Sequence, residues 1–231
     1  MAHSGVASRR TAEDMIRDGR VTVDGEPAHL GQKIDPQSQR VEIDGIPLPV
    51  RPDLVHILLN KPAGVVSTAS DPRGRPTVVD LVDQETRVYP VGRLDADSEG
   101  LILVTNDGEL TEVVTHPRFQ LPKTYVARVE GHPGKAVMRE MVDGIDLDDG
   151  LAKAMSSRLV DRNGSEALVE VVMAEGRKRE IRRMLAAVGH PVTRLVRVAI
   201  GPIRDRDLAP GDHRALTTEE VRSLYAAATV G

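Results

Sequence analysis

Apolar residues in the first fifty positions follow the period of a helix and then the period of short strands. Ala12, Met15 and Ile16 recur at the spacing of one helix face. We therefore expect a helix over residues 9–18, with Ser8 as its N-cap.

Short alternating segments follow this helix. Residues 21–23 and 41–43 read as strands, and each ends at an Asp-Gly pair, which favours a tight hairpin turn. Three prolines among residues 47–52 indicate a linker. The sequence thus predicts a small module over residues 1–48, a linker over 49–54 and a larger domain over 55–231.

The larger domain is predicted to be rich in strands. Apolar or alternating runs predict strands at residues 55–59, 101–105, 125–129 and 193–200, with residues 106–108 (NDG) turning the chain after the second. An Asn-Gly pair at 163–164 predicts a hairpin over about residues 155–173. A helical apolar face ending before Gly189 consists of Ile181, Met184, Leu185 and Val188. Because these elements do not alternate as βαβ units, the predicted class is α+β.

Composition narrows the possible functions. The chain has no cysteine, which excludes disulfides, thiolate nucleophiles and cysteine-ligated zinc, and no two of its seven histidines have the i, i+4 spacing of a helical zinc pair. No apolar run reaches the ~18 residues that span a bilayer, and the N-terminus lacks the pattern of a secretory signal. We therefore expect a cytoplasmic protein without a metal site.

The distribution of charge is more informative than the net charge of −4. Residues 177–206 contain nine basic side chains, which only Glu180 and Asp205 oppose, while acidic residues gather elsewhere, as over 143–149. A basic face for nucleic acid on a mildly acidic protein is consistent with this pattern. With three tyrosines and one phenylalanine, the chain cannot build a platform of stacked aromatics for single-stranded nucleic acid.

The most informative polar segment is the glycine-bounded loop GRLDADSEGL at residues 92–101, which leads into a buried strand. Asp95, Asp97 and Glu99 place three carboxylates within five residues. Such a loop is either a catalytic loop on a rigid sheet or a capped, solvated turn. Residues 96–100 (ADSEG) also resemble the nucleophile elbow of serine hydrolases around Ser98, but that elbow follows a strand, and here the strand comes afterwards.

A basic segment and a tyrosine are further candidates. Five of the seven residues 177–183 are basic, and Arg179, Arg182 and Arg183 are expected on one helix face opposite the apolar stripe. They form either a solvated charged face or a set of phosphate contacts with one arginine turned towards a carboxylate. Tyr125 is either core packing or a stacking surface for one base.

These segments together resemble the S4-domain-bearing bacterial ribosomal RNA pseudouridine synthases over nearly the whole chain, and most closely the B-type enzymes that act on the large ribosomal subunit. The resemblance is carried by KPAGVVST at 61–68, DPRGRPTV at 71–78, GRLDADSEGL at 92–101, TNDG at 105–108, KTY at 123–125 and REIRRM at 179–184. The family more often has Gln at the position of Glu180. Residues 5–10 (GVASRR) and 19–25 (GRVTVDG) resemble the S4 RNA-binding module.

The resemblance implies a catalytic domain with a mostly antiparallel mixed sheet and flanking helices, preceded by an S4-like module. The family's module usually begins with a further helical stretch before the segment equivalent to residues 2–5. The first helix is therefore expected to be truncated, either because the true start lies upstream or because the module is incomplete.

The same resemblance implies isomerisation of one uridine in ribosomal RNA, with 23S rRNA favoured, and without any cofactor. Asp95 would be the essential carboxylate and Arg182 its arginine partner. Tyr125 would stack on the flipped uracil and is a candidate for proton transfer at C5, while Arg93 would fill the space left in the RNA.

The remaining basic residues of these motifs are expected to contact RNA phosphates: Arg9, Arg10, Arg20, Arg73, Arg75, Lys178, Arg179 and Arg183. The expected partner is ribosomal RNA or a precursor of a ribosomal subunit, with no membrane and no small-molecule cofactor, and the default state is a monomer. The alternative function is that of a non-catalytic RNA-binding protein of ribosome assembly. That function needs the basic surface but not Asp95, Tyr125 and Arg182 together.

Overall fold

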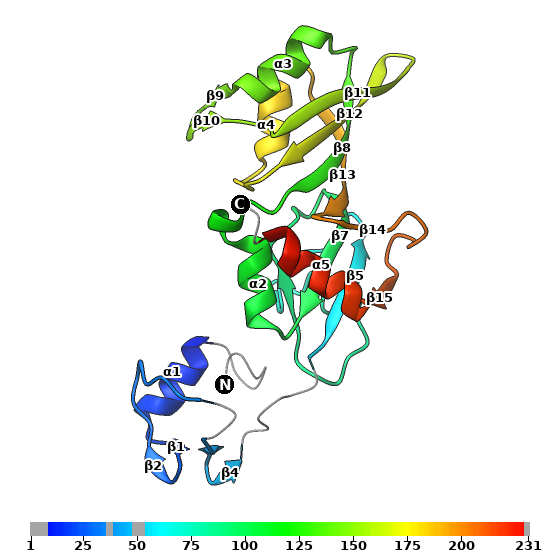
Figure 1. Cartoon of the computed structure of the whole chain (residues 1–231). Coiled ribbons are helices and arrows are strands. Elements are labelled where there is room, and N and C mark those ends of the chain that lie inside the picture. The colour runs from blue at the N-terminus through cyan, green and yellow to red at the C-terminus, as the bar shows by residue number, and fades with distance from the viewer. Residues whose placement is uncertain (1–8, 36–38, 48–53, 229–231) are drawn as a thin grey trace.

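The structure, a computed structural model, describes residues 9–35, 39–47 and 54–228 (Figure 1). The expected N-cap Ser8, the start of the S4-like module and nearly all of the predicted linker lie outside the described residues. Within the part that is described, no helix is long and apolar enough to cross a membrane.

The N-terminal region consists of one helix and a small antiparallel sheet. Its elements are α1 (Arg9–Arg17), β1 (Val21–Val23), β2 (Glu26–Pro27), β3 (Val41–Ile43) and β4 (Ile46–Pro47), with the strands in the order β2-β1-β3-β4. Ala12, Val21 and Val23 are its buried apolar residues. Both predicted Asp-Gly turns are confirmed, because all four of their residues have positive φ angles between 52° and 88°, as type I′ hairpin turns require.

The larger region contains a nine-stranded sheet in the order β11-β12-β8-β13-β7-β5-β15, with β14 paired to β13 and β6 paired to β7. Only the β13–β7 pair of these strands is parallel. The strands are β5 (His56–Lys61), β6 (Tyr89–Val91), β7 (Glu99–Thr105), β8 (Lys123–Glu130), β11 (Ser156–Asn163), β12 (Glu166–Met173), β13 (Val192–Ile200), β14 (Ile203–Arg204) and β15 (His213–Ala215). The predicted α+β class with a mostly antiparallel mixed sheet is confirmed.

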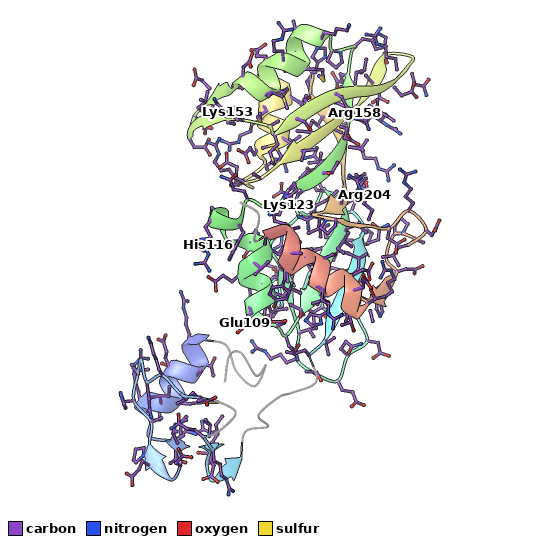
Figure 2. The ribbon with its side chains drawn as sticks, in the orientation of Figure 1. Glu109, His116, Lys123, Lys153, Arg158 and Arg204 are labelled. Carbon is purple, nitrogen blue, oxygen red and sulfur yellow. The ribbon has the colours of Figure 1, made fainter. Side chains whose placement is uncertain are left out.

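Helices and a small hairpin flank this sheet: α2 (Gly108–Thr115), the 3-10 helix η1 (Pro117–Phe119), α3 (Lys135–Asp143), β9 (Ile145–Leu147), β10 (Gly150–Ala152), α4 (Glu180–Ala187) and α5 (Thr218–Ala228). In Figure 1, α3 and α4 lie at the end of the sheet with β8, β11 and β12, whereas α2 and α5 lie side by side near β5 and β7. Lys123, the first residue of β8, lies where these two halves meet (Figure 2) and donates a hydrogen bond to the Val114 carbonyl at the end of α2.

The sequence predicted a turn at residues 106–108 but not the helix that follows it. Residues 106–108 do not simply turn the chain, because the Asp107 side chain accepts hydrogen bonds from the amides of Glu109 and Leu110 and so caps α2. The predicted strands, the 155–173 hairpin and the helix before Gly189 are confirmed, with ends shifted by at most two residues.

Three apolar clusters hold the larger region together. The first joins β8 and β12 to α3 and α4, the second joins β7 to α2 and α5, and the third joins β5 and β7 to residues 78–94. Tyr125 packs against both the first and the third cluster. A cavity lies at the seam between these two clusters.

Candidate active site

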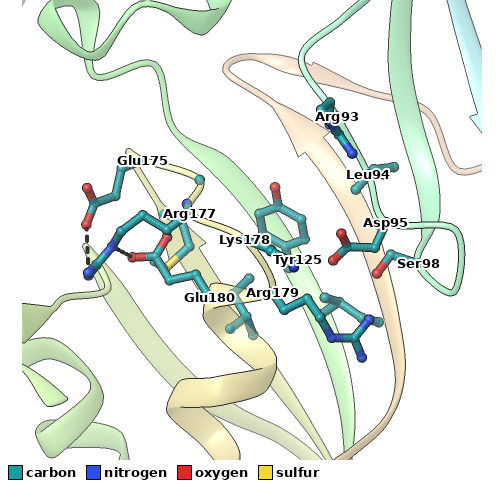
Figure 3. A pocket seen from close by; sticks show the side chains of 14 residues that line it. Arg93, Leu94, Asp95, Ser98, Tyr125, Glu175, Arg177, Lys178, Arg179 and Glu180 are labelled. Atoms are coloured by element: carbon teal, nitrogen blue, oxygen red, sulfur yellow. Dashed lines mark hydrogen bonds and ion pairs between the residues drawn. The ribbon is translucent and has the colours of Figure 1, made fainter. Parts of the chain in front are cut away.

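A cavity of about 340 Å³ lies at this seam. One side is formed by the loop before β7, the floor by side chains of β8, β12 and β13, and the other side by the segment leading into α4 (Figure 3). Its volume is at the lower end of the ~300–1,000 Å³ that small-molecule sites span. A single nucleoside is the size of ligand that such a cavity suits.

The carboxylate-rich loop is held in place by the upstream KPAGVVST segment. Gly64 donates its amide to the Ala96 carbonyl (2.7 Å), and the Ser67 hydroxyl both donates to the Leu94 carbonyl (2.9 Å) and accepts from the Leu94 amide (3.1 Å). The Ser98 amide donates to the Asp95 carbonyl (3.0 Å) and closes the turn. The sequence motif at 61–68 is therefore a support for the loop at 92–101.

Lys61 is the most deeply buried part of this support. Its ammonium group is fully buried and donates to the carbonyls of Pro62 (2.9 Å) and Val65 (2.8 Å), with Ala96 at 3.5 Å. Burial lowers the pKa of Lys61 to about 8, although the nearby carboxylates of the loop act in the opposite direction.

Asp95 lies half-buried in the wall of the cavity and faces Tyr125 (Figure 3). Among the described residues, its carboxylate forms no hydrogen bond and no ion pair, so it is available to a ligand. The neighbouring Asp97 differs: Arg179 binds it at 3.0 Å and Arg182 lies at 3.6 Å. Burial alone would raise the pKa of Asp97, but the Arg179 hydrogen bond and both guanidinium charges bring it below its ordinary value.

The position of Arg182 corrects one expectation. Instead of pairing with Asp95, its guanidinium donates to the backbone carbonyls of Asp97 (3.1 Å) and Val192 (3.2 Å). Arg179, not Arg182, lines the cavity together with Asp95. The two arginines thus fasten the loop through Asp97.

The predicted common face of Arg179, Arg182 and Arg183 is also wrong. Arg179 precedes α4 as its N-cap, with a φ angle of 52°, and Arg182 points to Asp97. Arg183 points away from both and donates to Asp148 (2.6 Å) and Asp149 (2.8 Å). The change of backbone direction at Arg179 separates side chains that a continuous helix would have placed together.

The acidic residues predicted to lie elsewhere meet the basic segment in space. Arg177 donates to Asp149 (3.0 Å) and to Glu180 (2.9 Å), and Glu175 lies at 3.6 Å from it (Figure 3). The β9–β10 hairpin therefore neutralises part of this segment. Sequence reasoning missed Glu175 as a cavity residue; burial, followed by the charge of Glu180, raises its pKa.

The other predicted RNA-contacting residues fall into two groups. Within the described residues, Arg10, Arg73, Arg93 and Lys178 form no ion pair, and Arg93 and Lys178 line the cavity. Arg20 and Arg75, in contrast, are paired locally with Asp44 and Asp71. The side chain of Arg9 lies outside the part of the structure that is described.

Ser98 does not have the setting of a hydrolase nucleophile. Strand β7 begins after it, its side chain is 2% exposed, and its hydroxyl has no hydrogen-bond partner among the described residues. None of the described residues lining the cavity is a histidine. No group of three or more His, Asp or Glu residues in the described part of the chain is arranged to hold a metal ion.

Comparisons with known proteins show which families this chain is similar to. Residues 55–187 match the family model of RNA pseudouridylate synthases, and residues 1–45 match that of S4 domains. An uncharacterized RNA pseudouridine synthase of Mycobacterium leprae is 45% identical over 230 residues, covering 97% of this chain and 90% of the relative. Ribosomal large subunit pseudouridine synthase B of Bacillus subtilis is 41% identical over 235 residues, covering 100% of this chain and 96% of the relative.

A solved structure extends the agreement to the fold. A crystal structure of a pseudouridylate synthase superimposes with a TM-score of 0.69 at 27% identity, covering 96% of each chain. The chain therefore belongs to the RNA pseudouridine synthases, a family of isomerases, and carries an S4 domain at its N-terminus.

Proposed function

We propose that this protein converts one uridine of large-subunit ribosomal RNA to pseudouridine, with Asp95 as the essential carboxylate. The observation that carries the proposal is the cavity of about 340 Å³, in which the unpaired Asp95 faces Tyr125 and basic side chains line the opposite side. The choice of RNA is supported by the similarity, over the whole chain, to a relative named for the large ribosomal subunit.

The proposed reaction breaks the bond from ribose C1′ to uracil N1, turns the base and joins C1′ to C5. The proton on C5 is lost and N1 gains one, so no oxidant, reductant or transferred group is needed, and we predict that no cofactor takes part. Asp95 either attacks the nucleoside covalently or removes a proton from the ribose. Both routes require an ionised carboxylate with an oxygen that is free to approach the ribose.

The other site residues are assigned roles around Asp95. Tyr125 stacks on the flipped uracil and is positioned for proton transfer at C5. Arg182 acts on the loop through Asp97, and Arg179 places a positive charge beside Asp95 in the cavity wall. Arg93, exposed at the cavity mouth, fills the space that the uridine leaves in the RNA.

RNA affinity is proposed to come from the basic residues that lack protein partners and from the N-terminal module. We retain the division into a module over 1–48, a linker over 49–54 and a catalytic domain over 55–231, and the monomeric, cytoplasmic state, as predictions. Deleting residues 1–48 is expected to weaken RNA binding and leave residual turnover. Unchanged affinity would show that the module is not the anchor.

Mapping of pseudouridine in ribosomal RNA tests the proposal. Wild-type protein is incubated with unmodified rRNA transcripts and with subunit precursors, and new carbodiimide adducts are located by primer extension. We expect a single new stop in large-subunit rRNA with wild type and none with Asp95→Asn. Asp146→Asn, which replaces an exposed carboxylate on β9, is the matched control and should give the wild-type stop. A stop that persists in Asp95→Asn refutes the assignment of Asp95, and a stop only in small-subunit rRNA refutes the choice of RNA.

If no substrate gives a stop while the protein still binds rRNA tightly, the ribosome-assembly alternative replaces the enzyme. The structure gives that alternative no specific support, because RNA binding alone does not need an unpaired carboxylate facing a tyrosine across a nucleoside-sized cavity.

A further inference from the structure

Arg197 is a buried arginine on β13 that none of the roles above uses. The residue is 5% exposed, and its Nε donates to the Leu101 carbonyl at 2.6 Å. Its Nη2 is also buried and has no hydrogen-bond partner among the described residues, and no carboxylate there forms an ion pair with it. The guanidinium charge is therefore left largely uncompensated by the protein.

Such an arrangement is unfavourable for folding. Removing an ion from water costs several kcal/mol unless partners and hydrogen bonds compensate it. The cation also affects its neighbours: burial, and to a smaller extent the charge of Arg197, lowers the pKa of Lys61 and that of Lys123 to about 8 each. A methionine or leucine would fill the space at lower cost, so the charge itself needs an explanation.

The position of Arg197 connects it to Tyr125. The two residues are directly opposite each other in the β13–β8 pairing, so their side chains share one face of the sheet. The Arg197 Cζ lies over the Tyr125 ring, 6.0 Å from its centre, at the outer limit of a cation–π contact. Leu195, two residues earlier on this face, lines the cavity. Arg197 thus lies behind the cavity wall and covers one side of the Tyr125 ring.

Arg197 is connected equally closely to the strand that follows the Asp95 loop. In the parallel β13–β7 pairing it lies opposite Gly100, and a Cβ added to Gly100 would lie 2.2 Å from the Arg197 carbonyl oxygen. The two backbones touch there, and the hydrogen bond to Leu101 continues the contact one residue further on. Arg197 therefore links β8, which carries Tyr125, to β7, which follows the Asp95 loop.

We propose that Arg197 is a positioning residue of the isomerisation: it fixes Tyr125 relative to the Asp95 loop and holds a permanent positive charge behind the cavity wall. The proposal rests on the roles proposed above for Asp95 and Tyr125. When the C1′–N1 bond breaks, its electron pair stays on N1 and the detached uracil becomes an anion. A fixed cation in a low-dielectric wall stabilises that anion without reorganising solvent. The charge is neutralised again when C1′ bonds to C5, C5 loses its proton and N1 gains one.

Two variants separate the charge from the packing. Arg197→Met keeps an unbranched side chain and removes the charge, whereas Arg197→Lys keeps the charge and loses the planar guanidinium. Single-turnover conversion is measured with saturating RNA on the substrate that wild type modifies, and the RNA Kd is measured separately by filter binding. We expect Arg197→Met to react ~100-fold more slowly with Kd within about threefold of wild type, and Arg197→Lys to recover about tenfold of that loss.

The matched control is Arg158→Met. Arg158 is an exposed arginine on the edge strand β11 (Figure 2); it is paired with Glu170 and does not line the cavity. Its removal changes the net charge by the same amount and should leave both the rate and Kd unchanged. Near-ultraviolet circular dichroism adds a structural readout, because a chain with three tyrosines and no tryptophan gives a signal that Tyr125→Phe can assign. We expect Arg197→Met to alter the part of the spectrum that Tyr125→Phe removes.

The outcomes separate the proposal from its alternatives. A folded Arg197→Met variant with wild-type turnover, or with a loss confined to Kd, overturns it. If Arg197→Met does not fold, Arg197→Lys decides: slower turnover at unchanged Kd supports the proposal, and wild-type turnover overturns it. Failure of both variants to fold assigns Arg197 to folding alone and also overturns it. Inactivity of the wild type itself would instead overturn the function proposed above.

Discussion

Replacing Gly100 with alanine should reveal how closely β13 approaches the strand that follows the Asp95 loop. The chain offers a matched control, because Gly100 and Gly150 both have a φ angle of 107°. A Cβ at Gly100 would lie 2.2, 2.6 and 2.9 Å from backbone atoms of Arg197, whereas a Cβ at Gly150 would meet nothing within 4 Å. Both substitutions therefore place a side chain at the same unfavourable φ angle, and only Gly100→Ala adds a collision.

The expected magnitudes follow from these contacts. A non-glycine residue held in such a sparsely populated region costs about 1–3 kcal/mol, which is all that Gly150→Ala should lose. Gly100→Ala adds the displacement of packed backbone, about 1–3 kcal/mol more, because no flexible side chain can move aside. At about 2–4 °C per kcal/mol for a domain of this size, Gly150→Ala should lower Tm by roughly 2–12 °C and Gly100→Ala by roughly 4–24 °C.

Thermal unfolding by calorimetry, with single-turnover conversion measured well below both transitions, checks this prediction. Turnover should fall at least ~10-fold in Gly100→Ala, because relieving a 2.2 Å contact moves β7 and β13 apart by about 1 Å and misplaces the Asp95 loop. Gly150→Ala should keep wild-type turnover. Equal losses of Tm at the two positions would refute the reasoning, since they would show that β13 and β7 are free to separate at Gly100.

Three further predictions concern individual side chains. Burial lowers the pKa of Lys61 from 10.5 to about 8, so the unfolded chain binds this proton more tightly than the folded one, and the resulting loss of stability is fully present below pH 8 and is relieved as pH rises towards 10.5. Between pH 7 and 9.5, the free energy of unfolding in urea should therefore rise by about 2 kcal/mol more for wild type than for Lys61→Met; a difference that stays constant would contradict this. The double variant Asp148→Asn, Asp149→Asn should free Arg183 to contact RNA phosphate, so filter binding should show tighter RNA binding whose affinity falls more steeply with salt. Unchanged binding would show that Arg183 does not contact the RNA. Ser98→Ala should keep wild-type turnover and equal or slightly greater stability by thermal unfolding, because the Ser98 hydroxyl is buried without a described partner; an orders-of-magnitude loss of turnover would restore a chemical role for Ser98.

Local patterns in the sequence predicted most of the larger region correctly. The Asn163-Gly164 pair placed a hairpin, and the apolar period over residues 181–188 placed α4, because turn chemistry and burial act over a few residues. The helices α2, α3 and α5 were missed, and α2 shows why. Its N-cap, Asp107, stands in a TNDG sequence that equally suits a turn, and only packing of α2 against α5 decides for a helix.

The sequence named Asp95, Tyr125 and the basic segment, which the cavity brings together, but not how their side chains are paired. The motifs at 92–101 and 179–184 identified Asp95 and the basic segment, but a helical projection placed Arg179, Arg182 and Arg183 together because it assumed a continuous helix. Neither the left-handed backbone at Arg179 nor the approach of the β9–β10 hairpin is encoded in the local pattern. Arg197 was noted only as one more basic residue, since its burial results from the pairing of β13 with both β7 and β8.

The loop's three carboxylates show why these pairings matter for chemistry. Glu99 binds Arg194 at 2.7 Å and Asp97 binds Arg179 at 3.0 Å, and these arginines hold the pKa of Glu99 and that of Asp97 below their ordinary values. Both carboxylates are thereby kept ionised and occupied. Asp95, the one of the three that lines the cavity, is left without a described ion-pair partner. A sequence with three acids in five positions does not say which one reacts. The pairings support our proposal that Asp95 does, because Asp97 and Glu99 are each bound bidentately by a guanidinium and would have to break that contact before approaching a ribose.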